Sequence, residues 1–329
     1  MRAVRLHGIG DLRVEEVAQP ASPGAGEVTL AVSMAGICGS DLHNFRTGAW
    51  ITRAPSVAGH EFTGTVTALG KGVSHVAPGD RVVVDSRHVC GTCAACRAGH
   101  SQVCENLGFL GEVIDGGFAE SVTLPARNVL RATGDVADRH LAMAEPLAVA
   151  LHALHRLAAP ADVPVVIAGC GPIGGLVALL ASRAGHAVTV LDRNTDRARL
   201  VAEATGGRVA THDSLPPFGH SVDTTGNDAV IAALLERIAG CGTLALVGIG
   251  AARPVIDPVL LVEREITLAG CHAYGDELFE VNDMLPDLAP HLDAFIAEEI
   301  PLDAVPDAYA RHLAGQVAGL KTIIRCRDG

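Results

Sequence analysis

Four of the nine cysteines lie within fifteen residues, in the pattern Cys90-x2-Cys93-x2-Cys96-x7-Cys104. Closely spaced thiolates are typical of a closed, tetrahedral structural zinc site. An iron–sulfur cluster uses the same ligands, but no second cysteine set or redox-partner segment accompanies this one. A thioredoxin-like Cys-x-x-Cys motif needs only two cysteines. The pattern therefore predicts a zinc ion held by the four thiolates.

A second set of residues with metal-ligating side chains is spread along the chain. Cys38 opens the run Cys-Gly-Ser-Asp-Leu-His, His60 and Glu61 follow a glycine, and Glu145 comes much later. Taken singly, a cysteine is usually a small core residue and a histidine a satisfied polar group. The spacing alone leaves a metal site and an ordinary core both open.

A third motif, Gly169-Cys170-Gly171-Pro172-Ile173-Gly174, has the form G-x-G-x-x-G. It follows a β-branched run, opens an apolar helix, and stands 23 residues before Asp192 at the end of the next expected strand. In this context the first glycine makes a tight turn, the second lets the backbone approach a pyrophosphate, and the third lets the helix pack on the strand. The pyrophosphate would meet the positive end of that helix. A glycine turn that binds no ligand would not require an aspartate such as Asp192 at the end of the next strand.

Two regions of the chain with different sequence patterns must position these residues. Residues 1–130 contain short alternating runs, such as 28–32 and 63–68, split by glycine and proline turns, which indicate a β barrel or sandwich. From an apolar helix expected over 141–157 onward, strands and helices alternate. Such alternation predicts a parallel sheet covered on both faces. The expected strands are 165–168, 187–191, 209–210, 221–223, 243–247 and 266–268, and the helices between them are 172–184, 196–205 and 229–239.

Composition excludes several classes of protein. The 329 residues suffice for about two domains, and 49% hydrophobic with 19% charged residues excludes a mainly disordered chain. A net charge of −12 disfavours nucleic acid as a partner. The uncharged run 163–182 is interrupted by glycines and a proline, so we expect a buried strand, turn and helix and no membrane span. No apolar stretch follows the first arginines, and the cysteine number is odd, so we expect a cytoplasmic protein.

Taken together, the motifs resemble the zinc-dependent medium-chain alcohol dehydrogenases, nearest the sorbitol and threonine dehydrogenase branch. The matching segments occur in family order and span nearly the whole chain: 36–41, 59–66, 78–82, the four-cysteine loop, 115–120, 145–148 and the glycine turn. The resemblance implies an α/β fold with a doubly wound parallel (Rossmann) cofactor domain and a β-rich GroES-like catalytic domain. The implied boundaries are 1–150 for the catalytic domain with its structural zinc loop, 151–272 for the NAD-binding domain, and 273–329 for a return to the catalytic domain.

The resemblance also assigns roles around the second set of ligands. It implies that Cys38 and His60 hold a catalytic zinc, completed by either Glu61 or Glu145, so that each chain binds two zinc ions. Ser40 matches the hydroxyl that takes the alcohol proton, and His43 matches an outer relay histidine. Gly39 stands where some alcohol dehydrogenases carry arginine, which favours the polyol branch.

For the cofactor we expect NAD rather than NADP. The Asp192 carboxylate can accept hydrogen bonds from ribose hydroxyls and would repel a 2′-phosphate, although Arg193 acts in the opposite direction. Further cofactor contacts are expected from Arg197, Thr225, Val247, Gly248 and Ile249. The chain departs from the family in three places. Residues 211–223, with two prolines, leave no room for the usual helix, and 270–274 lack the frequent arginine. Cys170 inside the glycine turn is unusual but fits sterically.

We therefore expect an NAD-dependent zinc oxidoreductase that transfers hydride between the cofactor and a secondary alcohol, polyol or ketone. We expect a small-molecule substrate, no nucleic-acid or membrane partner, and a homodimer or homotetramer. One alternative is a zinc dehydrogenase of threonine, an amino sugar alcohol or an aldehyde adduct. Another is a retired binding protein of the same fold, although intact Cys38, Ser40 and His60 argue against it. A zinc-free quinone reductase relative would lack the four-cysteine loop and Cys38.

Overall fold

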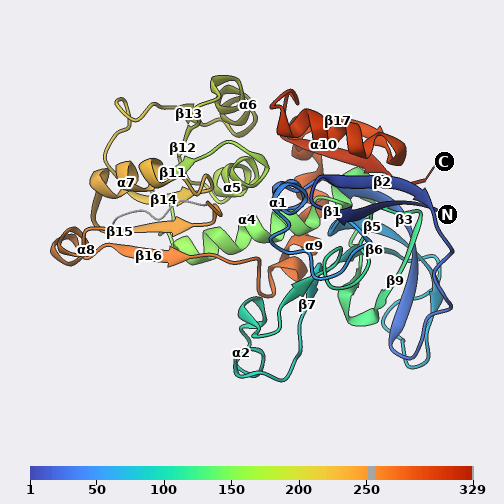
Figure 1. The fold of residues 1–329 in the computed structure, drawn as a ribbon. Coiled ribbons are helices and arrows are strands. Elements are labelled where there is room, and N and C mark those ends of the chain that lie inside the picture. The colour runs from blue at the N-terminus through green and yellow to red at the C-terminus, as the bar shows by residue number, and fades with distance from the viewer. Residues whose placement is uncertain (251–255, 328–329) are drawn as a thin grey trace. The chain divides into compact units, whose positions relative to one another are not determined.

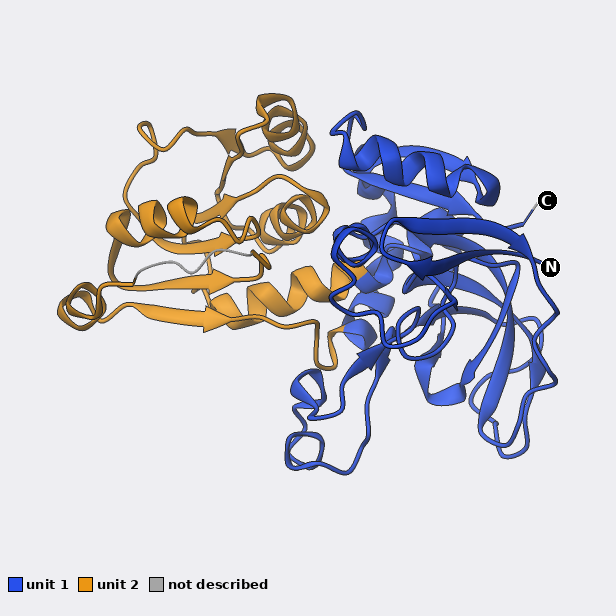
Figure 2. Cartoon of the chain, in the orientation of Figure 1, with its two compact units in different colours: residues 1–145, 278–329 blue, residues 146–277 orange. Residues whose placement is uncertain are grey.

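The structure is a computed structural model that describes residues 1–250 and 256–327. The chain divides into two compact units, one of residues 1–145 and 278–329 and one of residues 146–277 (Figure 2). The chain enters the second unit within the first turn of helix α4 (Ala144–Leu157), and it returns at the start of helix α9 (Glu277–Leu292). Each unit is described by itself below.

The first unit is built mainly of strands (Figure 1). Its sheets have the strand orders β10-β6-β5-β3-β18-β17, with β9 also paired to β3, then β2-β1-β4, and the pair β7-β8. The strands are β1 (Arg2–Gly8), β2 (Asp11–Glu16), β3 (Glu27–Gly36), β4 (Ser56–Val57), β5 (Glu61–Leu69), β6 (Arg81–Val84), β7 (Arg87–His88), β8 (Gly108–Phe109), β9 (Ser121–Pro125), β10 (Val129–Arg131), β17 (Ile296–Pro301) and β18 (Lys321–Arg325). The helices are α1 (Gly39–Thr47), α2 (Ala94–Arg97), α3 (Asp138–Leu141), most of α9, and α10 (Val305–Leu313).

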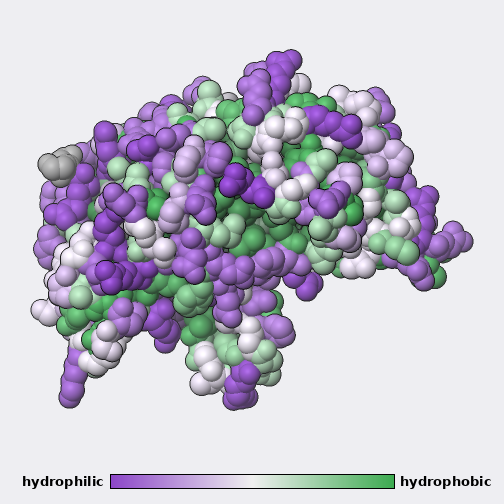
Figure 3. Space-filling view, turned by 180° about the vertical axis from the view of Figure 1, so that it is seen from behind, coloured by the Kyte–Doolittle hydropathy of each residue, from purple (hydrophilic) through white to green (hydrophobic). Residues whose placement is uncertain are grey.

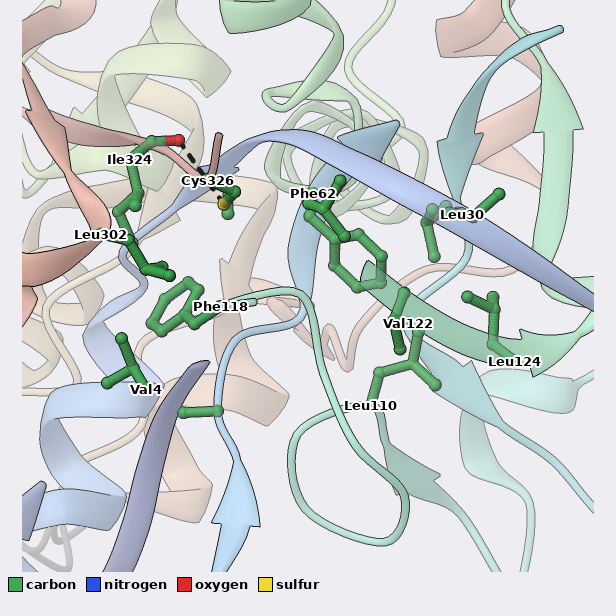
Figure 4. Packing of buried hydrophobic residues seen from close by; sticks show 14 of the residues in the cluster. Val4, Leu30, Phe62, Leu110, Phe118, Val122, Leu124, Leu302, Ile324 and Cys326 are labelled. Carbon is green, nitrogen blue, oxygen red and sulfur yellow. Dashed lines mark hydrogen bonds between the residues drawn. The ribbon is translucent and has the colours of Figure 1, made fainter. Parts of the chain in front are cut away.

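The core of the first unit follows from period-two alternation on its strands. In β9, Val122 and Leu124 are buried while the serine and threonine beside them are half-buried, and β3 buries Val28 and Leu30 in the same way. Figure 4 shows the two phenylalanine rings of Phe62 and Phe118 among aliphatic side chains from several strands. Burial of a side chain of this size stabilises the fold by about 1.5–3 kcal/mol. This core holds β3 and β5, whose ends carry the candidate site.

The second unit contains a six-stranded, fully parallel sheet in the order β13-β12-β11-β14-β15-β16. This is the doubly wound order, with the reversal of direction at β11, and it confirms the predicted fold class. The strands are β11 (Val165–Ala168), β12 (Val188–Leu191), β13 (Arg208–Val209), β14 (Phe218–Asp223), β15 (Ile238–Leu246) and β16 (Thr267–Gly270). Besides α4, the helices are α5 (Pro172–Arg183), α6 (Thr195–Thr205), α7 (Asp228–Arg237) and α8 (Pro258–Arg264).

Two helix predictions need correction. The helix expected over 229–239 ends at Arg237, because Ile238 opens β15, pairs with Phe218 and is 1% exposed. The helix expected over 141–157 is two helices, α3 and α4, separated by a turn at 142–143. Side chains on both sides of that turn are fully buried, so no change in hydrophobic pattern marks the break. As expected, no helix lies between β13 and β14.

The surface seen in Figure 3 carries many hydrophilic side chains, with apolar areas between them. Among the residues that the structure describes, every helix falls short of the length and apolar character that a membrane crossing would need.

Candidate active site and metal centres

Cys38 and His60 are linked through a single carboxylate. Cys38 caps the start of α1, and its backbone N–H donates to Asp41 Oδ2 at 2.9 Å. Asp41 Oδ1 lies 3.2 Å from His60 Nδ1. A proton on Nδ1 directed at Asp41 leaves the Nε2 lone pair for a metal, the usual arrangement of ligating histidines. Burial acts to lower the pKa of His60, but the charge and hydrogen bond of Asp41 raise this pKa well above its usual value.

Glu61 opens β5 and is completely buried, with one oxygen in an ion pair with Lys321 of β18. Lys321 is also buried, and burial acts to lower its pKa, but the negative charges of Glu61, Cys38 and Glu145 and the hydrogen bond to Glu61 together raise this pKa above its usual value. The backbone makes room for this pair at Gly36, the last residue of β3. A Cβ there would lie 2.4 Å from Glu61 Oε2 and 2.9 Å from Lys321 Cε. The other oxygen of Glu61, Oε1, is buried without a hydrogen-bond partner.

Cys38, His60 and Glu61 converge. Their ligand atoms all lie within 4.8 Å of one another. Sulfur, imidazole nitrogen and carboxylate oxygen form a donor set that suits zinc. Since a buried carboxylate oxygen without a partner is costly, a cation beside Oε1 would remove an unfavourable feature of the site. The residues therefore fit a zinc ion.

Glu145, the other expected ligand, lies near this group but outside the converging set. Ser86 donates a hydrogen bond to Glu145 Oε1 at 2.8 Å. Burial raises the pKa of Glu145 to about 7, an effect that the positive charge of His60 opposes and the negative charge of Glu61 reinforces. The carboxyl is thus held by a neutral partner next to a charged cluster.

The two residues expected to handle the proton lie on α1. Ser40 Oγ is 3.5 Å from His60 Nε2, so the hydroxyl faces the nitrogen that would bind a metal. His43 lies one turn further along, and its ring is 4.9 Å from the ring of Trp50. Trp50 is fixed through its backbone N–H, which donates to Asn44 Oδ1 at 2.8 Å. Among the described residues, no hydrogen bond joins Ser40 to His43.

The four cysteines of the loop form a second converging set, again with ligand atoms within 4.8 Å. The Cys104 sulfur is 3.5 Å from that of Cys90 and 3.9 Å from that of Cys93. Tetrahedral Zn–S bonds of about 2.3 Å would place sulfurs about 3.8 Å apart, so this set also fits zinc. Backbone N–H groups of Thr92 and Cys93 donate to the Cys90 sulfur and lower its pKa to about 5.

In the second unit, the glycine turn joins β11 to α5. Gly169 has φ +95°, which favours glycine, and a Cβ on Gly174 would lie 1.9 Å from the Gly169 carbonyl oxygen. Gly171, the N-cap of α5, is open on its Cα side, because a Cβ added there would meet no atom within 4 Å beyond its chain neighbours. Pro172 and Ile173 form the first turn of α5. The turn therefore leaves an accessible backbone at a helix N-terminus, an arrangement that fits a pyrophosphate group.

Asp192 follows β12, and both of its oxygens accept hydrogen bonds from backbone N–H groups. Cys170 N donates at 2.6 Å and Asn194 N at 2.7 Å. The carboxylate is consequently fixed beside the glycine turn. Arg193 is exposed, and Arg197, on the first turn of α6, is half-buried.

The remaining expected cofactor contacts follow β14 and β15, at the carboxyl edge of the sheet where ligands of such folds bind. Thr225 Oγ1 donates to Asp223 Oδ1 at 2.6 Å. Val247 and Gly248 donate their backbone N–H groups to the Asp223 carbonyl oxygen. Ile249 is 70% exposed.

Three residues around the candidate metal site of Cys38, His60 and Glu61 were not predicted from the sequence as participants: Asp41, Ser86 and Lys321. Asp41 carried a local signal, since it stands three residues after Cys38 at a helix start. Lys321 opens the apolar run Thr-Ile-Ile, where a buried strand would not ordinarily contain a lysine. Ser86 carried no signal.

Comparison with known proteins agrees with this geometry. Residues 24–134 match the family described as the alcohol dehydrogenase GroES-like domain. The chain is 33% identical to 2-dehydro-3-deoxy-L-galactonate 5-dehydrogenase of Pseudoalteromonas atlantica, covering 93% of both chains. It is 32% identical to L-threonine 3-dehydrogenase of Saccharopolyspora erythraea, covering 85% of both. It is 28% identical to sorbitol dehydrogenase of Bacillus subtilis, covering 98% of this chain and 97% of that one.

Solved structures resemble the whole chain. One is a short chain alcohol dehydrogenase from E. coli CFT073 with NADH, at a TM-score of 0.91, 26% identity and 99% coverage of both chains. Another is a protein from Sinorhizobium meliloti 1021 bound to NADP, at a TM-score of 0.90, 28% identity and 98% coverage of both.

Proposed function

Because the chain belongs to the zinc-dependent medium-chain alcohol dehydrogenase family and is an alcohol oxidoreductase, we propose that it oxidises secondary alcohols or polyols with NAD as the preferred acceptor. The observation that carries this proposal is the convergence of Cys38, His60 and Glu61, with an unpartnered buried oxygen, beside the Ser40 hydroxyl. A retired binding protein would have no need to keep this arrangement.

In this proposal Cys38, His60 and Glu61 hold the catalytic zinc and Cys90, Cys93, Cys96 and Cys104 hold a structural zinc. The convergence of ligand atoms within 4.8 Å supports Glu61 as the third ligand in place of Glu145. Glu145 remains beside the site through its hydrogen bond from Ser86.

The chemistry divides between bound groups and the chain. A zinc ion held by Cys38, His60 and Glu61 would supply Lewis acidity that makes an alcohol hydroxyl more acidic, and a bound nicotinamide cofactor would supply the hydride acceptor. Ser40 accepts the hydroxyl proton through a hydrogen bond, and His43 passes a proton onward toward solvent. Asp41 holds His60 in the tautomer that has a free Nε2, and so fixes the ring for metal binding.

Cofactor preference follows from how firmly two side chains are held. Asp192 is fixed by two backbone N–H groups, so its negative charge cannot turn away from a 2′-phosphate. Arg193 is exposed and can turn toward solvent. A bound cofactor would be held at its pyrophosphate by Gly169, Gly171, Pro172, Ile173 and Gly174, and further contacts would come from Arg197, Thr225, Val247, Gly248 and Ile249. We accordingly propose NAD over NADP.

Two further properties belong to the proposal. A dimer or tetramer is proposed for the quaternary structure, which light scattering would test. The cytoplasm is proposed as the compartment, because metal-binding thiols persist in a reducing environment.

The experiment is a screen of metal-replete enzyme for NAD reduction with sorbitol, 2,3-butanediol and L-threonine, followed by NADH absorbance. We expect turnover with at least one of the two polyols. L-Threonine is the second candidate substrate, because a threonine dehydrogenase is among the relatives that share most of the chain. Zinc-loaded, folded enzyme that reduces NAD with none of these or with a wider panel of alcohols would contradict the proposal.

A further inference from the structure

The candidate catalytic site has one potential metal ligand more than a catalytic zinc can use. Cys38, His60 and Glu61 converge, with their ligand atoms within 4.8 Å of one another. Glu145 is a fourth residue of suitable type, and it is buried in the same unit. Four protein ligands close a zinc site, as in structural centres, whereas three leave a position for water or substrate. Catalysis therefore requires that one of the four stay off the metal.

Glu145 is held at the same end of the sheet as the converging ligands. Strands β5 and β6 pair antiparallel, so the start of β5, which carries Glu61, lies beside the end of β6. Ser86 stands two residues beyond the end of β6, and its hydroxyl donates to Glu145 Oε1 at 2.8 Å. The charges of His60 and Glu61 also act on Glu145. The Glu145 carboxyl is thus close to the ligands without being one of the converging set.

Ser86 is a firmly held donor. It is completely buried in the short connection between β6 and β7. The residues on either side of it are bridged by Asn128, whose Nδ2 donates to the carbonyl oxygens of Asp85 and Arg87 at 2.7 Å each. The Arg87 guanidinium also donates to both carboxylate oxygens of Asp85. Because the backbone is fixed on both sides, the Ser86 hydroxyl has a defined position relative to Glu145.

Building on the proposed function, we propose that Ser86 is a positioning residue that holds the Glu145 carboxylate off the catalytic zinc and so keeps the fourth coordination position open for substrate. Among the described residues, Glu145 lies outside the converging set, so it would have to move, and break its bond from Ser86, to reach the metal. Glu61 differs, since its Oε1 is buried and the described residues give it no hydrogen-bond partner. The hydroxyl thereby selects Glu61 over Glu145 as the third ligand.

Zinc affinity tests this inference without depending on turnover. Ser86→Ala frees Glu145 to become a fourth ligand, so we expect the Kd for this zinc to fall about 10–100-fold, the range over which neighbours of metal ligands typically act. Ser86→Thr keeps the hydroxyl and should retain the Kd of the unmodified protein. Glu145→Gln should retain it as well, because Glu145 is not a ligand. Titration with a chromophoric chelator measures each Kd, and Cys38→Ser identifies the contribution of the four-cysteine loop.

The open coordination position can be observed directly with cobalt(II) in place of zinc. In the unmodified protein, added imidazole should enter that position and shift the visible absorption of the cobalt ion, whereas the closed cysteine loop should not respond. Ser86→Ala should lose most of this shift, and Ser86→Ala combined with Glu145→Gln should regain it. Ser121→Ala is the matched control, since its hydroxyl donates to the Leu30 carbonyl at 2.9 Å in the same unit, and it should behave as the unmodified protein.

Turnover should follow the coordination state. Ser86→Ala should lower kcat at least about tenfold, and Glu145→Gln in the same chain should restore part of it. Unchanged or weaker zinc binding in Ser86→Ala would overturn the inference. Weaker zinc binding in Glu145→Gln would also overturn it, because Glu145 would then be a ligand, and this measurement decides the point even if Ser86→Ala does not fold. If no alcohol is oxidised at all, the proposed function fails, and the Kd values and cobalt spectra still decide the role of Ser86.

Discussion

The two candidate metal centres of the first unit are assembled in opposite ways. The four thiols come from one loop of fifteen residues and are surrounded by backbone N–H donors from that same loop. The other centre combines the start of α1 with the start of β5, and it is held by Lys321 from the last strand and Asp41 from α1. One centre needs only its own loop, whereas the other exists only when distant parts of the chain have folded together.

The surroundings differ in the same sense. The sulfurs of the loop cysteines accept hydrogen bonds from backbone N–H groups and lie against one another. Around Cys38 and His60, the neighbours include the Ser40 hydroxyl and several carboxyl groups. A closed set of four thiolates suits structure, and an incomplete set beside a hydroxyl suits catalysis. Substitutions at matched positions should separate the two roles.

The largest contrast is expected between Cys38→Ser and Cys93→Ser. Cys38→Ser should abolish turnover and remove about one zinc ion per chain while the protein stays folded. Cys93→Ser should instead lower stability and the yield of folded protein, because binding of a structural zinc contributes directly to the free energy of folding. Metal content, circular dichroism and kcat measured on both variants decide the point. If both variants lost turnover to the same extent and both stayed folded, the proposed distinction between a catalytic and a structural zinc site would be wrong.

Ser40→Ala should have the next largest effect, a fall in kcat of about 10²–10⁴-fold, which is typical for a positioned proton acceptor. The Kd for NAD should change little, because the hydroxyl acts only on the reacting oxygen. Stopped-flow measurement of the hydride step, with Thr47→Ala at the end of the same helix as a control, checks this. A hydride step as fast as that of the unmodified enzyme would disprove the proton role of Ser40.

The long-range assembly of the second centre can be tested at Lys321. Lys321→Met leaves Glu61 buried without its cation and should destabilise the protein by about 3–5 kcal/mol. Adding Glu61→Gln should restore part of that loss, because the unpaired charge is gone. Lys71→Met, on an exposed turn, is the matched control and should have almost no effect. The free energy of unfolding of both variants can be measured by urea denaturation. Equal values for Lys321→Met and Lys71→Met would contradict a structural role for the ion pair of Lys321 and Glu61.

The smallest expected effect concerns the second unit and leaves both metal centres intact. Asp192→Gly should shift the ratio of kcat/KM for NAD over NADP by at least about tenfold toward NADP, because Arg193 then faces the 2′-phosphate unopposed. Zinc content should stay the same. If the unmodified enzyme already uses NADP as well as NAD, then Asp192 does not outweigh Arg193 in setting the cofactor preference.

The same contrast between local and distant assembly explains how far the sequence could lead. The strand 165–168 is predictable to the residue, because a run of β-branched side chains beside a glycine turn is a local signal. The end of α7 is not, because Ile238 and Ala239 do not disfavour a helix and only pairing with Phe218 assigns Ile238 to a strand. The two strands that meet there are distant in sequence.

The residues of the candidate sites also fall into those that could be predicted from the sequence and those that could not. The converging cysteines of the loop and the G-x-G-x-x-G turn could be identified from spacing, since their geometry is set within one segment. Lys321 could not be assigned to Glu61, because 260 residues separate them and only the pairing of β18 with β3 brings them together.

The central claim is that each chain carries two zinc ions with separable roles, and metal counting during gradual chelation tests it most directly. Elemental analysis of metal-replete protein should give two zinc ions per chain. Removal of the first by a mild chelator should abolish NAD reduction while circular dichroism remains unchanged, and removal of the second should unfold the loop and lower the melting temperature. One zinc ion or fewer in fully loaded protein, or loss of fold before loss of turnover, would contradict the account.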